Sequence, residues 1–508
     1  MTGESRTSKS IKNAKVALAF YFINLVLQFL SRKVFLDYLG AEVLGLNTTA
    51  QNLLGFLNLA ELGVSFAISY TLYTPLLRKD EQTINEIVSL QGWLYRRIAY
   101  IIICGAVVLM CLFPWMFAKA DVPFWYAYAT FTVLLCSSLF GYFWNYRQIV
   151  LTADQQEYKV TFNIEGCKLL KIALQLVLIA YLPYGYISWL VLEFLAAVVT
   201  VRLVNRLLKR TYPWLKTDIS RGVELKLRYP QIMAKTKQLF FHKIGGFVLT
   251  QTSPLIVYAF SSLTLVAIYG NYLLLIAGIS RFLDAVFNSI GAGVGNLVSE
   301  GDKKKIWGVF LELFSSRFLL VSTACYSVYI LTSDFITLWV GEQYLLDNIT
   351  LLLLIAIMYV NLMRTVVDVF INAYGLFQDV WATLTEAGLN VGMSVLLGYF
   401  YGLHGILCGV LISLLSIIFV WKPYFLFRDG MKMSITKYIG VYCRCLCIGV
   451  VTWACVDWVR PDIEVEGWLD WGVAAVVTAG LFFVFELLLL CCFDKSMRRF
   501  IQRFLKMF

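Results

Sequence analysis

The chain has 508 residues, of which 60% are hydrophobic and only 15% are charged, and its formal net charge is +11. A composition this apolar excludes a water-soluble globular protein and predicts an integral membrane protein. The longest stretch without a predicted spanning segment, residues 206–226, is a basic loop that is too short for a soluble domain. The chemistry of the chain is therefore expected in or at the bilayer.

Apolar segments long enough to cross a bilayer recur along the whole chain, since a spanning helix needs roughly 20 apolar residues. The N-terminal segment has the charge pattern of a secretion signal, but no small-residue cleavage site follows the apolar run from Val16, so we interpret it as a retained first helix. Short turns at residues 38–40, 182–185 and 402–405 separate neighbouring spans. Fourteen spans are predicted, centred near residues 27, 60, 100, 136, 170, 196, 247, 282, 320, 361, 388, 415, 446 and 480.

Lys and Arg gather on one side of this predicted topology. Alternate segments hold 28 of them, whereas the opposite loops hold two, Lys119 and Arg460. Because cytoplasmic loops collect Lys and Arg, both termini are predicted to be cytoplasmic and the number of helices to be even. The net charge then follows from topology, and no nucleic-acid partner is implied. The predicted cytoplasmic segments are residues 1–15, 76–86, 150–160, 206–237, 300–306, 375–379, 422–437 and 494–508.

The two halves of the chain align with each other at a shift of about 222 residues. The shift places residues 41–54 against 264–277, and a shift of 221 places Glu165 on Glu386. This pattern predicts an all-α polytopic membrane protein with 14 transmembrane helices, in two pseudo-symmetric six-helix bundles plus two C-terminal helices. A substrate path is expected between the bundles. The predicted divisions are 1–210 for the N-terminal bundle, 211–430 for a cytoplasmic linker and the C-terminal bundle, and 431–508 for two additional transmembrane helices and a basic cytoplasmic tail.

Neither an enzyme nor a cofactor site is predicted. The chain has only two histidines, His242 and His404, and nearly all of its 12 cysteines lie in apolar segments, so no zinc, haem or disulfide framework is expected. The glycine-rich run at residues 291–295 lacks the lysine of a nucleotide-binding P-loop. The outer loops, the longest near 333–347 and 459–467, are too short for the catalytic part of a glycosyltransferase or polymerase.

The opening helical hairpin carries a family resemblance. Residues 29–80, FLSRKVFLDYLGAEVLGLNTTAQNLLGFLNLAELGVSFAISYTLYTPLLRKD, contain an LG-x-E-x-LGLN element, a central ELG and a closing YxLYxPL. They resemble the opening of bacterial polysaccharide flippases, which handle O-antigen or capsule repeat units. These proteins form the polysaccharide transporter family of the MOP (multidrug/oligosaccharidyl-lipid/polysaccharide) exporter superfamily. The fourteen-helix plan and the duplication extend the resemblance over the whole chain.

The resemblance implies a flippase of the bacterial inner membrane that translocates undecaprenyl-diphosphate-linked oligosaccharide by alternating access through a cationic central cavity. It also implies polysaccharide polymerase or other assembly proteins as candidate partners. Two alternatives share the architecture. One is a peptidoglycan lipid-precursor flippase, and the other is a cation-coupled drug or small-molecule antiporter of the same superfamily, which would usually have twelve helices and an acidic pocket.

Several charged residues lie inside predicted spans, where each costs at least about 2.5–3.5 kcal/mol at the centre of a helix. Guanidinium groups bind phosphate oxygens bidentately and lysines act as point charges, so such cations would suit a diphosphate in a cavity between the bundles. In related flippases, arginines on helices 1 and 8 belong to a cationic cavity, and Arg32 and Arg281 correspond to these positions. The candidate cations are Arg32, Lys168, Lys171, Arg281 and Arg364, with Arg32 and Arg281 implied by the resemblance.

The same residues have structural interpretations. The spacings of Arg281 with Asp284 and of Arg364 with Asp368 allow ion pairs within one helix, with no role in substrate binding. Lys168 can belong to a helix that extends into the cytoplasm, and Glu312 and Arg317 are predicted to serve helix ends or bundle contacts. Glu61 and Glu193 have no evident partner on their own helix, so they either couple transport to protons or bond across helices. The candidate coupling or pairing acids are Glu61, Glu165, Asp284 and Asp368.

Overall fold

The computed structural model describes residues 6–61, 63–118, 120–288, 291–376 and 378–505. Lys119, one of the two cations predicted in outer loops, lies outside these ranges. Within them the chain is helical and contains no β-strand. Ten of the described helices are long and apolar enough to cross a membrane, which makes the protein an all-helical polytopic membrane protein. The chain forms two compact units, Met1–Ala267 and Ile268–Phe508.

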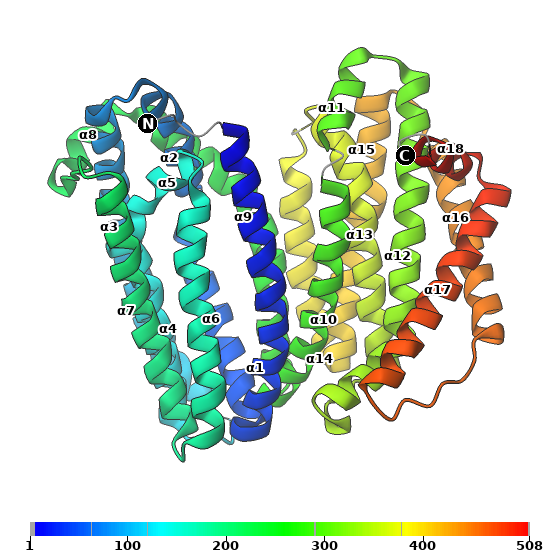
Figure 1. Ribbon diagram of the computed structural model, residues 1–508, viewed down its shortest axis with the longest axis horizontal. Coiled ribbons are helices and arrows are strands. Elements are labelled where there is room, and N and C mark those ends of the chain that lie inside the picture. The colour runs from blue at the N-terminus through cyan, green and yellow to red at the C-terminus, as the bar shows by residue number, and fades with distance from the viewer. Residues whose placement is uncertain (1–5, 62, 119, 289–290, 377, 506–508) are drawn as a thin grey trace. The chain divides into compact units, whose positions relative to one another are not determined.

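The first unit consists of long helices that run side by side, with short helices at their connections (Figure 1). Helices α1, α6 and α7 pack on one another, and α4 packs against both α1 and α7. Its elements are α1 (Arg6–Leu57), η1 (Asn58–Glu61), α2 (Val64–Arg78), α3 (Glu81–Met116), α4 (Phe124–Phe143), η2 (Asn145–Gln148), α5 (Ile149–Ala153), α6 (Glu157–Tyr181), α7 (Gly185–Thr211), η3 (Ile219–Arg221), α8 (Gly222–Arg228) and α9 (Pro230–Phe260).

In the second unit α12 is the central helix, since it packs against α13, α17 and α18. Two π-helical segments, η5 and η6, continue α14 toward the cationic loop that precedes α16. The elements are α10 (Leu263–Asn288, which begins in the first unit), α11 (Gly291–Glu300), α12 (Lys303–Trp339), η4 (Glu342–Tyr344), α13 (Asn348–Ala373), α14 (Val380–Leu414), η5 (Leu415–Trp421), α15 (Lys422–Phe425), η6 (Leu426–Met431), α16 (Ile435–Val459), α17 (Trp468–Phe493) and α18 (Lys495–Leu505).

The turns predicted from the sequence are confirmed. Gly40, with φ 84° and ψ 166°, interrupts α1, and Gly402, with φ 56° and ψ −134°, interrupts α14. Positive φ values are accessible to glycine at little cost because it has no Cβ. Residues 182–184 separate α6 from α7. Every predicted span centre falls in a helical segment, whereas the full set of fourteen spans stays a prediction.

Contacts within the first unit bring together the segments that were predicted to share one side of the membrane. At one end of the unit, three hydrogen bonds join different segments that were predicted to be cytoplasmic. At the opposite end, the Glu42 carboxylate accepts from the backbone N–H of Asp121 at 3.0 Å. Predicted cytoplasmic segments therefore meet at one end of this unit, and predicted outer segments meet at the other. The three interactions are Tyr158 N–H to Asn13 Oδ1 (2.7 Å), Tyr212 OH to Asp154 Oδ2 (2.8 Å) and Arg228 Nη1 to Glu86 Oε1 (2.7 Å).

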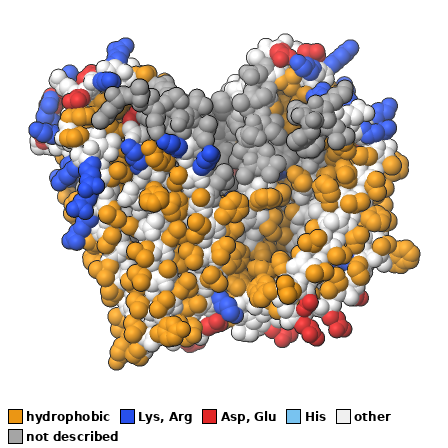
Figure 2. All heavy atoms as spheres, in the orientation of Figure 1, with side chains coloured by type: hydrophobic (Ala, Val, Ile, Leu, Met, Phe, Trp, Pro, Cys, Tyr) orange, Lys and Arg blue, Asp and Glu red, His pale blue; other side chains and the backbone are white. Residues whose placement is uncertain are grey.

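The second unit shows the same alternation. Lys422 pairs with Asp379 at 2.8 Å, and both belong to segments that were predicted to be cytoplasmic. At the other end, His404 contacts Asp347 at 2.9 Å. Acidic side chains gather at this second end, where α16 connects to α17 (Figure 2). Hydrophobic side chains cover most of the visible flank of each unit, as expected for helices that face lipid.

Apolar packing holds α2 against α3 in the first unit. In the first unit, Ala67 and Ile68 of α2 pack with Ile87 and Val88 of α3 in a fully buried core. At Gly45 a Cβ atom would lie 1.9 Å from the Leu263 carbonyl oxygen. Only glycine therefore allows this close approach between α1 and the start of α10.

Candidate functional site

Arg32 lies on α1 and reaches the first turns of α10. Its Nη2 donates to the Ala267 carbonyl oxygen at 2.8 Å. The close approach at Gly45 brings the two helices into backbone contact, and this contact places the acceptor within reach. A carbonyl oxygen is a neutral acceptor, so this bond satisfies a donor without neutralising the guanidinium charge.

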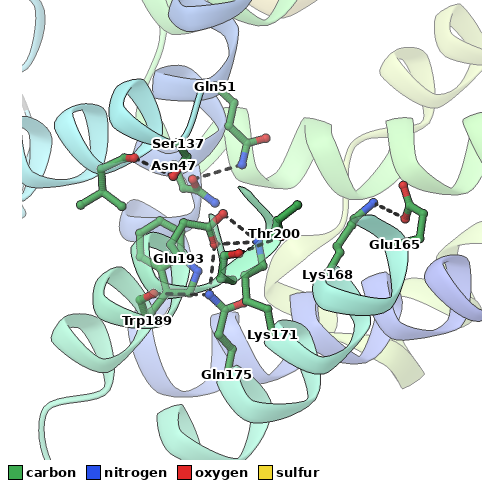
Figure 3. Close-up of polar contacts among 12 residues, drawn as sticks. Asn47, Gln51, Ser137, Glu165, Lys168, Lys171, Gln175, Trp189, Glu193 and Thr200 are labelled. Atoms are coloured by element: carbon green, nitrogen blue, oxygen red, sulfur yellow. Dashed lines mark hydrogen bonds and ion pairs between the residues drawn. The ribbon is translucent and has the colours of Figure 1, made fainter. Parts of the chain in front are cut away.

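Lys171 lies on α6 and forms an ion pair with Glu193 of α7. Its Nζ lies 2.7 Å and 2.8 Å from the two carboxylate oxygens of Glu193. Gln175 Nε2 donates to Glu193 Oε2 at 3.1 Å and to the Trp189 carbonyl oxygen at 3.4 Å (Figure 3). The Lys171 and Glu193 side chains are 18% and 15% exposed, so the pair is largely removed from solvent and lipid. Its bonds cross two helices, which explains why no spacing within one helix predicted it.

A second polar group lies on α6 at Lys168 and Glu165. Their Nζ and Oε2 atoms are 3.4 Å apart, at the i, i+3 spacing noted in the sequence. Asn24 of α1 donates to the same Glu165 oxygen at 2.7 Å and ties the pair to the neighbouring helix. Figure 3 shows this pair apart from the group formed by Lys171 and Glu193. The two α6 lysines therefore have separate acidic partners.

The remaining candidate cations belong to the second unit. Arg364 Nε donates to Asp368 Oδ2 at 2.8 Å within α13, and the two side chains are about one third exposed. The i, i+4 spacing thus forms the pair within one helix that the sequence allowed. Arg281 lies on an exposed face of α10. That all five candidate cations share one cavity stays a prediction.

Asp284 binds an arginine from a different helix. Arg317 of α12 has a fully buried side chain, and its Nη2 donates to Asp284 Oδ1 at 2.6 Å. Its Nε donates to the Leu362 carbonyl at 3.0 Å and its Nη1 to the Leu283 carbonyl at 2.9 Å. Arg317 therefore joins α10, α12 and α13, in agreement with the bundle contact predicted for it. The sequence could not name its partner, because the partner lies 33 residues away.

Glu61 lies at the end of η1 in a cluster of hydroxyl groups. Glu61 Oε1 accepts from Ser65 Oγ at 2.7 Å and from Tyr95 OH at 2.5 Å, and these two hydroxyl oxygens are 2.6 Å apart. The three oxygens thus make three mutual contacts. With an ionised Glu61, only two hydroxyl protons serve these contacts. A neutral Glu61 would supply the third proton.

The other Glu61 oxygen belongs to the same network. Tyr142 OH lies 3.1 Å from Glu61 Oε2 and 3.0 Å from Asn58 Oδ1, so its single proton serves two acceptors. Ser138 and Tyr95 join these residues in lining a polar cavity of about 300 Å³. The geometry can therefore accommodate one additional proton. The sequence analysis noted only that Glu61 is an acid with no evident partner on its own helix. Nothing else in the sequence indicated the hydroxyl groups around it.

No protein-family profile and no curated protein sequence matches the chain. Solved structures do match it. The lipid II flippase MurJ in an inward closed conformation has a TM-score of 0.65 at 12% identity, covering 94% of this chain and 99% of that one. An inward-facing multidrug resistance MATE family transporter of the MOP superfamily has a TM-score of 0.55 at 14% identity, covering 80% and 95%. This chain shares the fold of these two structures.

A third structure has the same fold. It is a MOP superfamily transporter from Pyrococcus furiosus that is described by the reverse polarity of its binding pocket. Its TM-score is 0.50 at 13% identity, covering 85% of this chain and 98% of that one. A flippase and a multidrug transporter both match, so the fold alone does not select a substrate.

Proposed function

We propose that this chain is a flippase that moves undecaprenyl-diphosphate-linked oligosaccharide across the bacterial inner membrane, with both termini in the cytoplasm. The likeness, over 94% of the chain, to a structure described as a lipid II flippase supports a flippase. The resemblance of residues 29–80 to polysaccharide flippases carries the choice of substrate. Charged residues in its membrane helices, such as Lys171 and Arg364, add support, because their insertion cost favours a functional role.

Such a substrate needs a protein because its head group cannot cross hydrocarbon unaided. Each sugar hydroxyl costs roughly 2–7 kcal/mol when it loses water without a replacement hydrogen bond, and an ionised phosphate costs far more. A hydrophilic path between two bundles that open alternately would remove this barrier. The polyprenyl chain would remain in the surrounding lipid.

The candidate cations have defined roles in this proposal. Arg32, Lys168, Lys171, Arg281 and Arg364 would contact the diphosphate during passage. At Lys171 the diphosphate would take the place of Glu193, because phosphate oxygens offer the same charge-assisted bonds as a carboxylate. The ion pair would then re-form after release, so that no bare ammonium group is left among the helices between cycles.

Energy for the cycle would come from ion gradients. An anionic head group that leaves a negative interior gains about 2.3 kcal/mol per charge for each 100 mV. Glu61 is the proposed proton carrier, because the three contacts among Glu61, Ser65 and Tyr95 are served by only two hydroxyl protons. Proton uptake at Glu61 would be coupled to the change in access.

The decisive experiment deletes the gene and follows lipid-linked oligosaccharide. Accumulation of this lipid on the cytoplasmic leaflet, reversed by the wild-type gene, is the expected result. Proteoliposomes that hold the purified chain should then move a fluorescent undecaprenyl-diphosphate oligosaccharide between leaflets. Absence of both accumulation and transport would reject the proposal.

The alternative function is a flippase for lipid II, the substrate in the name of the structural neighbour MurJ. The same proteoliposomes, loaded with lipid II, separate the two functions. Transport of lipid II alone, together with rescue of a strain that lacks its lipid II flippase, would replace our proposal by a role in peptidoglycan synthesis. Polysaccharide polymerase is a proposed partner of the chain. Crosslinking of this chain to the polymerase in cells tests the partnership.

The proposed orientation has its own test. An alkaline phosphatase reporter inserted at Asp462, between α16 and α17, should be active because it reaches the outer face, and one inserted at Thr217 should be inactive. Both residues lie in connections between helices, so neither insertion interrupts a span. The reverse pattern of activity would overturn the cytoplasmic placement of the termini.

A further inference from the structure

A groove separate from the polar clusters above opens between α4 and α7 of the first unit. Its volume is about 630 Å³. Phe140 and Trp144, one helical turn apart at the C-terminal end of α4, form one wall. The end of α7 forms the other wall. The volume falls in the range of sites for small organic ligands and exceeds the needs of a single phosphate ion.

The α7 wall changes from apolar to cationic along its length. Val198 and Val201 come first, followed by Arg202 and Arg206 and then by Lys209 and Arg210. The spacings of three and four residues place all of these side chains on one face of the helix. The groove therefore has an apolar part and a positively charged part in line.

The cations of this groove differ from those in the interior of the unit. Arg202, Arg206, Lys209 and Arg210 are all exposed. In the described part of the chain, none of the four makes an ion pair or a hydrogen bond with another side chain. Lys168 and Lys171 on α6, by contrast, each contact a carboxylate. The groove therefore presents positive charge that the protein itself does not neutralise.

The position of the groove along α7 matches the edge of a membrane. Arg202 follows Gly185 by seventeen residues, a distance of about 25 Å along the helix. A hydrocarbon layer is about 30 Å thick, so the first cation lies near the level of the lipid phosphates. Trp144 is 51% exposed on the opposite wall, and tryptophan is typical of this interface.

We propose that this groove binds an anionic phospholipid of the leaflet next to the C-terminal end of α7. Arg202 and Arg206 bind its phosphate, because guanidinium groups match phosphate oxygens bidentately. The first carbons of an acyl chain lie along Val198, Val201 and Phe140. The lipid is a resident of the membrane and not the transported cargo, so this site is independent of the proposed transport path.

Binding of phosphatidylglycerol to the purified full-length protein in detergent, measured by native mass spectrometry, tests the site. The wild-type chain should bind phosphatidylglycerol in preference to phosphatidylcholine. Each cation near a membrane surface contributes roughly a fivefold gain in affinity for anionic lipid, so R202Q/R206Q should weaken binding by roughly 30-fold. K303Q/K304Q at the start of α12 removes the same charge and should retain binding.

Two further arms test the shape of the site and the identity of the ligand. V201W keeps all four cations but fills the apolar part, and it should also weaken binding of phosphatidylglycerol. Thermal unfolding of R202Q/R206Q and V201W, compared with the wild-type chain, checks that both variants are folded. Binding that is unchanged in both groove variants would overturn the proposal. So would equal binding of inorganic phosphate, which would indicate an anion site only, or displacement of phosphatidylglycerol by much tighter undecaprenyl diphosphate, which would assign the groove to the cargo.

Discussion

Arg317 donates to Asp284 across 2.6 Å, and the arginine side chain is completely buried while the aspartate is 41% exposed. The same guanidinium donates to two carbonyl oxygens, those of Leu283 and Leu362. One side chain therefore satisfies polar groups from two other helices of the second unit. A buried cation is tolerated only when its partners are in place.

Replacement of Arg317 by alanine should reduce the free energy of unfolding by about 2–3 kcal/mol, since it leaves two carbonyl groups and a partly exposed carboxylate without their donor. R317K should lose less, because the ammonium keeps the charge but cannot reach all four acceptors of the guanidinium. Thermal unfolding in detergent measures both. K305A, which removes an exposed ion pair with Glu300, is the control and should change little. If R317A unfolds at the wild-type temperature, the contacts of Arg317 with α10 and α13 do not contribute to stability.

Exchanging the charges of the Lys171–Glu193 pair separates its contribution to stability from its contribution to transport. K171M leaves Glu193 without its cation among the helices and should cost roughly 2–3 kcal/mol, below the 3–5 typical of fully buried pairs. K171E/E193K restores an attractive pair and should recover most of this stability. Transport should not recover in the exchanged variant, because the cation then projects from α7 instead of α6. Full transport by K171E/E193K would assign the pair to packing alone.

Glu61 can be tested by removing its titration while keeping its shape. E61Q retains hydrogen-bonding atoms at the same positions, so the variant should fold with nearly wild-type stability. Transport driven by a pH gradient should fall at least about tenfold if proton uptake at Glu61 is required. This is a lower bound, because a positioned proton-transfer group typically contributes about 10²–10⁴-fold to a rate. Y95F, which removes one hydroxyl of the network, should give an intermediate rate. Transport by E61Q that still responds to the gradient would exclude Glu61 as the coupling group.

The stability of the second unit at acid pH should depend on Asp347. Desolvation raises the pKa of Asp347, but hydrogen bonds from Thr350 and His404 outweigh it and hold this pKa well below the ordinary range. A carboxylate with a lowered folded pKa contributes stability above its unfolded pKa, about 3.9, and this contribution is lost as pH falls through the folded pKa.

D347N keeps an acceptor for the backbone N–H groups of Ile349 and Thr350, which Asp347 caps at the start of α13. The wild-type chain should therefore be more stable than D347N at pH 7, and the difference should shrink as pH falls below about 4. Unfolding temperatures of both proteins between pH 7 and pH 3 measure this convergence. A constant difference across that range would show that ionisation of Asp347 does not contribute.

Two ion pairs among the candidate residues could be predicted from the sequence, but the partners of the other residues could not. Glu165 with Lys168 and Arg364 with Asp368 pair as their spacing indicates, because helix geometry alone brings residues three or four apart onto one face. The partners of Lys171, Asp284 and Glu61 could not be named. Each bonds to a residue on another helix, and no periodicity within one segment encodes which helices become neighbours.

The sequence by itself determined that the chain is a helical membrane protein and where its helices break, and it predicted which segments share a side of the membrane. These follow from local rules, since hydrocarbon requires long apolar helices and loops on one face collect Lys and Arg. Only the tertiary structure decided that Arg317 reaches Asp284, that Lys171 reaches Glu193, and that three hydroxyl groups surround Glu61. Packing made these choices, because a polar group among apolar helices takes the partner that the neighbouring helix presents.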